Sequence, residues 1–253
     1  MSSLLLSMAL LASPGVTNGV DKPMETPRSM MIEFKLGPMV PLVDRAFNDG
    51  STPYKSTFGG KGKNVWMLLG EIQFERQLFQ EFGTLAAGVS IGYGEKYAHE
   101  VRSDGSISAD PTSLKIMPLK ALASYRFDWL AINHNIPLVP YLKAGLVLMP
   151  WWITDSTGVA VTEGLPGKGV NYGYFGTVGL ALQLDFLDPR LARDFDTGVG
   201  VNHTYLFGEF TLQEVNNFGK QLPPDPNNPK PNTTLAAIDL SSQHWMFGIA
   251  LEF

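Results

Sequence analysis

Residues 88–92 read Gly-Val-Ser-Ile-Gly, the spacing at which serine hydrolases carry their nucleophile. In those enzymes a strand, a sharp turn and then a helix raise the serine hydroxyl above the sheet. Here the alternation of residue types runs straight through Ser90, from Leu85 to Gly94, and the residues that follow predict no helix. We therefore interpret the two glycines as making room in a narrow interior, and we predict no catalytic residue.

The four histidines, His99, His134, His203 and His244, show neither the H-x-x-x-H nor the HExxH spacing of zinc sites. We place His99 in an outer loop, His134 in a short turn, and His203 and His244 at strand ends. The chain has no cysteine, which excludes disulfides and thiolate metal sites. The sequence therefore predicts no metal and no cofactor, and structural hydrogen bonds for the histidines.

Eight charged residues recur on the polar side of segments with period-two alternation. They are Glu33, Lys35, Glu71, Glu75, Lys120, Arg126, Lys143 and Glu209. Buried charges need partners of opposite sign. If these residues share an interior, they can pair with one another as a structural network. If the apolar side is the interior instead, as in a soluble sandwich, they lie on a solvated surface. Alternation alone does not distinguish the two.

Eight segments carry this alternation, which is typical of strands exposed to different surroundings on their two faces. They span residues 31–38, 65–75, 85–94, 117–128, 138–148, 172–185, 203–212 and 244–253. Most are long enough for a tilted strand to cross a bilayer. In 138–148, for example, Leu142, Leu146 and Leu148 lie on one side, and Tyr141 and Lys143 on the other.

The lengths of the connections favour the membrane alternative. Long gaps, which follow every odd-numbered segment, span residues 40–63, 95–113, 150–170 and 213–243. Shorter gaps, which follow the even-numbered ones, span 77–83, 129–137 and 186–202. Outer-membrane barrels have long outer loops and short periplasmic turns. We predict an all-β fold, an eight-stranded antiparallel up-and-down transmembrane β-barrel over residues 30–253.

The start of the chain predicts export. Leu4 to Ala12 is an apolar run too short for a transmembrane helix, and it reads as the core of a signal peptide over residues 1–19, although no Lys or Arg precedes it. A periplasmic linker over 20–29 and a location in the bacterial outer membrane follow. The net charge of −5 gives no basic stripe, so we expect no nucleic-acid partner. The mean hydropathy of +0.01 fits a barrel and a soluble domain equally.

Aromatic residues support the same fold. Trp66, Trp151 and Trp152 stand at the loop ends of segments and Trp129 at a turn end, as in the aromatic belts at membrane interfaces, although tryptophans also fill cores. The last segment places five apolar residues on one parity: Trp245, Phe247, Ile249, Leu251 and Phe253. This pattern resembles the signal read by the machinery that inserts bacterial outer-membrane barrels, which would make that machinery a partner during biogenesis.

Residues 186–196, Phe-Leu-Asp-Pro-Arg-Leu-Ala-Arg-Asp-Phe-Asp, predict a short helix in the last turn, capped by Asp188 with Pro189 at its first position. Its charges pair locally or meet a periplasmic partner. With the residues that follow, to Phe210, this stretch resembles an uncharacterised family of outer-membrane β-barrel proteins from myxobacteria and their relatives. The resemblance covers about residues 139–253. It implies fold and location, and no reaction.

An eight-stranded barrel is just wide enough for side chains to fill it. Our first hypothesis is therefore a structural or surface-interaction barrel without catalytic activity, in contact with outer-membrane lipid and with an extracellular ligand at its loops. The alternatives are a narrow channel or binding barrel for a small or apolar ligand, and a barrel enzyme that modifies lipid.

Overall fold

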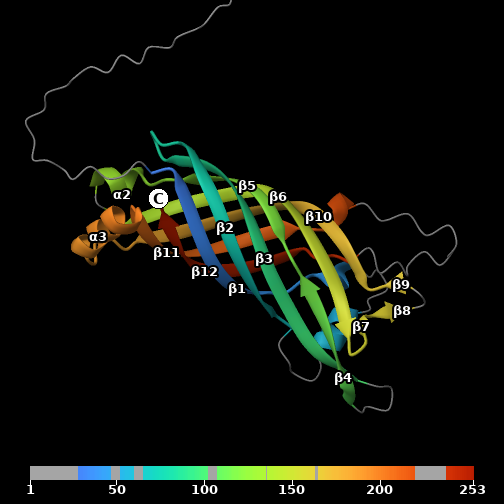
Figure 1. The fold of residues 1–253 in the computed structure, drawn as a ribbon. Helices are drawn as coiled ribbons and strands as arrows, with labels where there is room; N and C mark the ends of the chain where they lie inside the picture. Colours follow the sequence, from blue (N-terminus) through green and yellow to red (C-terminus); the bar gives the residue numbers. More distant parts are fainter. Residues whose placement is uncertain are drawn as a thin grey trace, which may run out of the picture.

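The computed structural model describes residues 28–46, 52–59, 65–101, 107–134, 136–162, 165–219 and 238–253 (Figure 1). The predicted signal peptide and most of the predicted linker lie outside these residues. Ser29, at the end of that linker, already donates its backbone N–H to the carbonyl oxygen of Phe253 at 2.6 Å.

The elements are mostly strands. In chain order they are β1 Met30–Met39, η1 Val43–Ala46, α1 Pro53–Phe58, β2 Met67–Phe79, β3 Thr84–Val101, β4 Ile107–Ile116, β5 Leu119–Arg126, α2 Trp129–His134, β6 Leu138–Asp155, β7 Gly158–Val159, β8 Val161–Thr162, β9 Leu165–Pro166, β10 Lys168–Gln183, α3 Pro189–Val199, β11 His203–Glu214, η3 Asn217–Gly219 and β12 Ser242–Glu252.

The sheet closes into a ring of eight antiparallel strand positions. β4 and β5 share one position, because both pair with β3 and with β6 on either side of Met117 and Pro118. Around the ring, β6 pairs with β10, β10 with β11, β11 with β12, and β12 with β1. A closed ring leaves no free edge in its wall. The predicted eight-stranded up-and-down barrel is confirmed.

The two ends of the barrel differ in structure (Figure 1). At one end, which we call the α3 end, lie α2, α3 and the tight turn at Gly83. A side chain at Gly83 would meet the carbonyl oxygen of Arg126 at 2.6 Å, and its φ of 142° suits glycine. At the other, the β4 end, β3, β4 and β6 extend beyond the rest of the wall, with β7 to β9 beside them.

The prediction of long loops is wrong for two segments. Residues 95–113 continue β3 to Val101 and begin β4 at Ile107, so that His99 lies in a strand and not in a loop. Residues 150–170 likewise contain the end of β6, the short strands β7, β8 and β9, and the start of β10. The ladder continues here although the hydrophobic alternation weakens, because backbone pairing does not require an apolar face.

The predicted helix is confirmed as α3, which begins at Pro189, and Asp188 accepts the backbone N–H of Arg190 at 3.1 Å. The helices α1 and α2 were not predicted, because each has only six residues. No helix in the described residues has the length and hydropathy needed to cross a bilayer.

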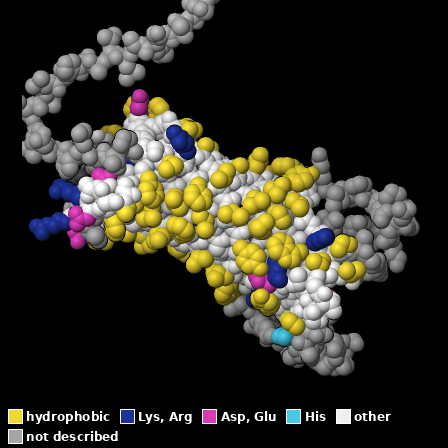
Figure 2. Space-filling model, in the orientation of Figure 1, with side chains coloured by type: hydrophobic (Ala, Val, Ile, Leu, Met, Phe, Trp, Pro, Cys, Tyr) yellow, Lys and Arg dark blue, Asp and Glu magenta, His cyan; other side chains and the backbone are white. Residues whose placement is uncertain are grey.

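The outer wall is apolar, and the inner wall carries the buried charged residues. Leu146 is 62% exposed, whereas Lys143 three residues earlier is 3% exposed. The same inversion holds for Phe34 and Lys35 on β1 and for Ile72 and Glu71 on β2. Figure 2 shows the resulting hydrophobic band across the middle of the face in view. A water-soluble sandwich has the opposite arrangement.

Candidate functional site in the barrel interior

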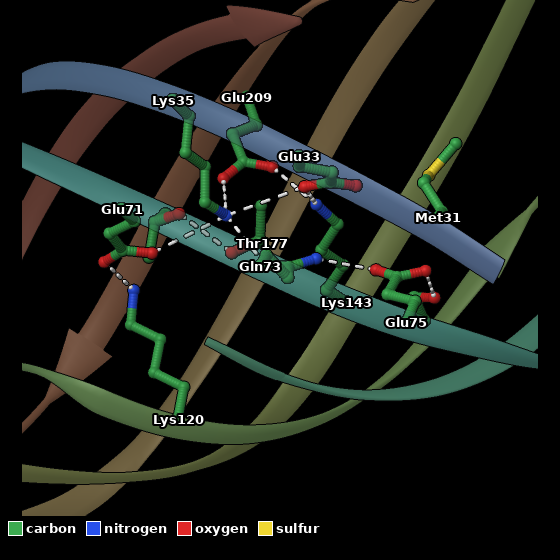
Figure 3. Close-up of polar contacts among 12 residues, drawn as sticks. Met31, Glu33, Lys35, Glu71, Gln73, Glu75, Lys120, Lys143, Thr177 and Glu209 are labelled. Carbon is green, nitrogen blue, oxygen red and sulfur yellow. Dashed lines mark hydrogen bonds and ion pairs between the residues drawn. The ribbon is translucent and has the colours of Figure 1, made fainter. Parts of the chain in front are cut away.

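Seven buried charged residues meet in the middle of the interior, and we call them the ionic belt. They are Glu33, Lys35, Glu71, Glu75, Lys120, Lys143 and Glu209. Lys35 on β1 has the most contacts: its Nζ donates to Glu209 Oε1 at 2.7 Å and to Gln73 Oε1 at 2.9 Å, and lies 3.6 Å from Glu71 Oε2 (Figure 3).

Lys143 on β6 binds two carboxylates, one from β1 directly across the ring and one from β11, two strand positions away. Its Nζ donates to Glu33 Oε2 at 2.6 Å and to Glu209 Oε2 at 3.0 Å. The hydroxyl of Tyr141 donates to the same Glu209 oxygen at 3.0 Å. Glu209 therefore joins strands on three sides of the ring, and charge-assisted hydrogen bonds of this kind are the stronger class.

Lys120 on β5 pairs with Glu71 at 2.5 Å. Glu75 instead accepts from two neutral donors, Gln73 Nε2 at 2.6 Å and Ser124 Oγ at 2.7 Å. The glycines beside Ser90 make room for the two carboxylate side chains. A Cβ at Gly88 would lie 2.9 Å from Glu75 Cγ, and one at Gly92 would lie 2.8 Å from Glu71 Cγ.

Arg126 is the predicted charge that stays apart from the ionic belt. It lies nearer the α3 end, where its Nη2 is 3.4 Å from Glu252 Oε1 and its Nη1 is 3.2 Å from Met31 Sδ. Sequence reasoning missed Glu252 as its partner, together with Tyr205, which donates to Glu252 Oε2 at 2.8 Å. The parity of β12 could have identified Glu252, because it opposes the apolar set of that strand.

The interior toward the β4 end is filled by apolar side chains, which we call the apolar plug. Its main members are Met39, Tyr54, Phe58, Met67, Leu69, Ile116, Met149 and Trp151. Tyr54 and Phe58 come from α1, so part of the connection after β1 packs inside the barrel mouth. The sequence did not predict this plug.

The expected interfacial position of Trp151 is wrong. Its side chain is 1% exposed and belongs to the plug, where its Nε1 donates to Asn171 Oδ1 at 3.0 Å. Trp66 and Trp245, by contrast, are exposed on the outer wall. Two adjacent tryptophans in one strand must point to opposite faces, so only one of Trp151 and Trp152 can face outward.

The apolar residues of the final segment lie on the outer wall of β12. Trp245, Phe247 and Ile249 are exposed, and Leu251 and Phe253 are half-buried. Phe210 of β11 packs on Trp245 with ring centroids 5.1 Å apart. That the barrel-insertion machinery recognises these residues stays a prediction.

A smaller polar cluster lies at the α3 end. Asp185 accepts hydrogen bonds from His203 and from Gln183 Nε2, the second at 2.8 Å, and from the backbone N–H of Thr204 at 3.2 Å. Burial raises the pKa of Asp185, but the hydrogen bonds from His203 and Gln183 outweigh it, and the pKa lies below its usual value. This cluster ties the β10–β11 connection to the barrel.

The interior offers little space for a substrate or a permeating ion. A cavity of about 10 Å³ lies among Glu33, Arg126, Tyr141, Tyr205 and neighbouring apolar residues, which is about enough for one water. Ser90 is 5% exposed in the middle of β3, with no turn beside it. Within the described residues, no three His, Cys, Asp or Glu side chains are grouped to hold a metal ion.

No protein-family model matches the chain, and no curated protein matches it. Solved structures with a similar fold include Neisserial surface protein A, at 12% identity, a TM-score of 0.44 and coverage of 89% of this chain and 97% of that chain. Another is Ail, the attachment invasion locus protein of Yersinia pestis, in complex with the heparin analogue sucrose octasulfate, at 11% identity, a TM-score of 0.44 and coverage of 91% and 100%.

The outer membrane protein OprG from Pseudomonas aeruginosa is also similar, at 10% identity, a TM-score of 0.36 and coverage of 89% and 96%. The chain thus resembles small eight-stranded outer-membrane barrels in structure. This likeness assigns no family, and the resemblance to the myxobacterial barrels stays a prediction.

Proposed function

We propose that this chain is an integral outer-membrane barrel with a structural or surface-interaction role. In this proposal the apolar band meets lipid, the filled interior keeps the wall rigid, and the β4 end faces the outside. The protein has no catalytic activity, and its contacts with other molecules are made by the strands and loops that extend from the β4 end.

The apolar outer wall is the observation that carries the proposal. Leu146, Val178 and Val89 are 62%, 63% and 58% exposed on neighbouring parts of the wall. Soluble monomers rarely expose a contiguous apolar surface larger than a few hundred Å². A barrel with no free edge satisfies the backbone groups of its wall internally, which is the condition for strands to span hydrocarbon.

The filled interior argues against a pore. The three lysines and four carboxylates of the ionic belt reach into the interior from several strands and pair with one another there. The apolar plug closes the side toward the β4 end. An ion that crossed the barrel would have to break both layers. We therefore expect no steady conductance in planar bilayers, and a sustained single-channel current would favour the narrow-channel alternative.

Heat-modifiable gel migration with cell fractionation tests the barrel in the membrane. The protein expressed with residues 1–29 in a Gram-negative host should fractionate with the outer membrane, and its band should shift on boiling. A protein confined to the soluble fraction, with no shift on boiling, contradicts the proposal.

Trypsin tests the orientation. In the sequence, Arg102 falls between the last residue of β3, Val101, and the first residue of β4, Ile107, whereas Arg190 and Arg193 belong to α3. Added to intact cells, trypsin should cut after Arg102 and leave the α3 sites uncut until the outer membrane is permeabilised. Cleavage in α3 of intact cells would reverse the orientation.

A further inference from the structure

A groove of about 770 Å³ crosses the outer wall of the barrel, on the face formed by β2, β3, β5, β6 and β10. Outward-facing residues line it, among them Val89, Ala121, Leu146, Leu148 and Tyr172. We infer that it is a binding site for a phosphorylated membrane lipid. The inference rests on the proposed membrane location and deepens it, because it names one lipid class at one place on the wall.

The groove exists because a small side chain lies between larger ones at the same level. Ala121 on β5 is paired with Val89 on β3 and with Leu146 on β6. Five strands spaced about 4.8 Å apart give the groove a length of about 19 Å across the wall. In a bilayer this space must be filled by hydrocarbon, because apolar walls without partner atoms lose dispersion contacts.

Phe218 forms one wall of the groove and is held there by an unusual backbone. It has φ 55° and ψ 37°, a left-handed conformation that is rare for a bulky residue. Its ring stacks on Tyr174 with centroids 6.1 Å apart and leans on Tyr172 at 5.6 Å, and it remains 53% exposed. Asn217 fixes the turn by accepting the backbone N–H of Tyr172 at 3.0 Å.

Basic residues lie beside this groove, toward the β4 end. Trp152 on β6 is paired with Lys115 on β4 and with Lys168 on β10, so two cations flank one interfacial tryptophan. Trp152 follows Leu148 by four residues, about 13 Å along the strand. Figure 2 shows basic side chains at that margin of the hydrophobic band.

The charges select the occupant. Lys168 is exposed, and the Lys115 side chain is 25% exposed with Glu95 at 3.4 Å. A lipid whose acyl chain lies in the groove would have its headgroup near the two lysines. A phosphate at that place is attracted by both ammonium groups. A zwitterionic lipid of the same chain length carries a cation beside its phosphate, so its attraction to the two lysines is weaker. The site therefore fits an anionic, phosphorylated lipid.

Native mass spectrometry of the barrel released from mixed vesicles tests this inference. The vesicles contain phosphatidylcholine with a minor fraction of phosphatidic acid with the same acyl chains. We expect the wild-type protein to retain phosphatidic acid in preference to phosphatidylcholine. Lys115→Gln and Lys168→Gln should each lower that preference about fivefold, the factor that corresponds to ~1 kcal/mol for one lysine at a membrane surface.

Ala121→Leu fills the groove and should reduce retention of both lipids, and Phe218→Ala removes its side wall and should do the same. The matched controls are Ala87→Leu, an exposed alanine on β3 outside the groove, and Arg76→Gln, an exposed base at the α3 end. Neither control should change retention.

Heat-modifiable migration of each variant separates the possible failures. A wild-type barrel that shifts on boiling but retains the two lipids equally overturns this inference and leaves the proposed function standing. Equal losses in Ala121→Leu and Ala87→Leu also overturn it. A wild-type protein without the heat shift contradicts the proposed function itself.

Discussion

The ionic belt and the apolar plug fill one interior by opposite means. In the belt, Lys35 and Lys143 each donate to Glu209, at 2.7 and 3.0 Å. In the plug, Met149 and Trp151 are 0% and 1% exposed among other apolar side chains. Removing one member of a buried ion pair leaves an uncompensated charge, whereas removing one apolar side chain leaves a cavity. The cost in stability of a substitution in the belt should therefore depend on which charged partner remains. In the plug it should depend on the volume removed.

Lys143→Leu should have the largest effect. It removes the cation that binds Glu33 and Glu209, and we expect a loss of about 3–5 kcal/mol in the free energy of unfolding. Denaturant titration in detergent micelles, with the heat shift as readout, measures it. The double variant Lys143→Leu with Glu33→Leu should recover part of the loss, because an apolar pair can replace a buried ion pair. If the double variant is less stable than the single one, the belt is not organised in this pairwise way.

Met149→Ala tests the plug and should lower stability by about 2–5 kcal/mol, as expected for a cavity in a packed core. Met149→Leu keeps the volume and should cost less than about 1.5 kcal/mol. The same titration serves for both variants. Equal effects of the two substitutions would show that volume does not govern this half of the interior.

Asp185→Asn tests the polar cluster at the α3 end, with an expected loss of about 1–2 kcal/mol near neutral pH. The pKa of Asp185 is lower in the folded state, so its contribution is present above the unfolded pKa of about 4 and is lost as the pH falls through the folded value. The wild-type protein should lose this stability on acidification, and the variant should lack that component. Identical pH profiles of stability for the two proteins would contradict the assignment.

Glu75→Gln should have the smallest effect, within about 0.5 kcal/mol. In the described part of the chain Glu75 has no ion pair within 4 Å, and it accepts only from Gln73 and Ser124. The belt contains four carboxylates and three lysines, so neutralising this one balances the charges. A loss of stability comparable with that of Lys143→Leu would contradict this expectation. It would mean that the charge of Glu75 stabilises the belt, although its contacts are with neutral groups.

The ionic belt could be predicted from the sequence because charge and parity coincide there. Lys35, Lys120 and Lys143 each stand between outward apolar residues, so period-two alternation identifies both faces. The same signal disappears at the β4 end, where Met67, Leu69 and Trp151 face inward while their neighbours are also apolar. A strand that is apolar on both faces shows no alternation, and so the plug and the inward position of Trp151 were missed.

Which partner each charge takes was also beyond the sequence. Arg126 shares the parity of the belt, but strand tilt and register place it beside Glu252, on a strand 126 residues away in the chain. The entry of Tyr54 and Phe58 into the barrel mouth depends on the path of the connection after β1. No local pattern specifies that path.

The absence of native cysteine allows a direct test of which face of the wall meets hydrocarbon. Single cysteines placed in turn at residues 141–144 and 146–148 of β6 can carry a spin label in the membrane-reconstituted protein. Gly145 is left out because a Cβ there would clash with the carbonyl oxygen of Ala121. We predict that collisions with oxygen alternate with period two, high at positions 142, 144, 146 and 148 and low at the inward positions. High accessibility of the inward positions to a water-soluble nickel complex, with the even-numbered positions shielded from oxygen, would contradict the account.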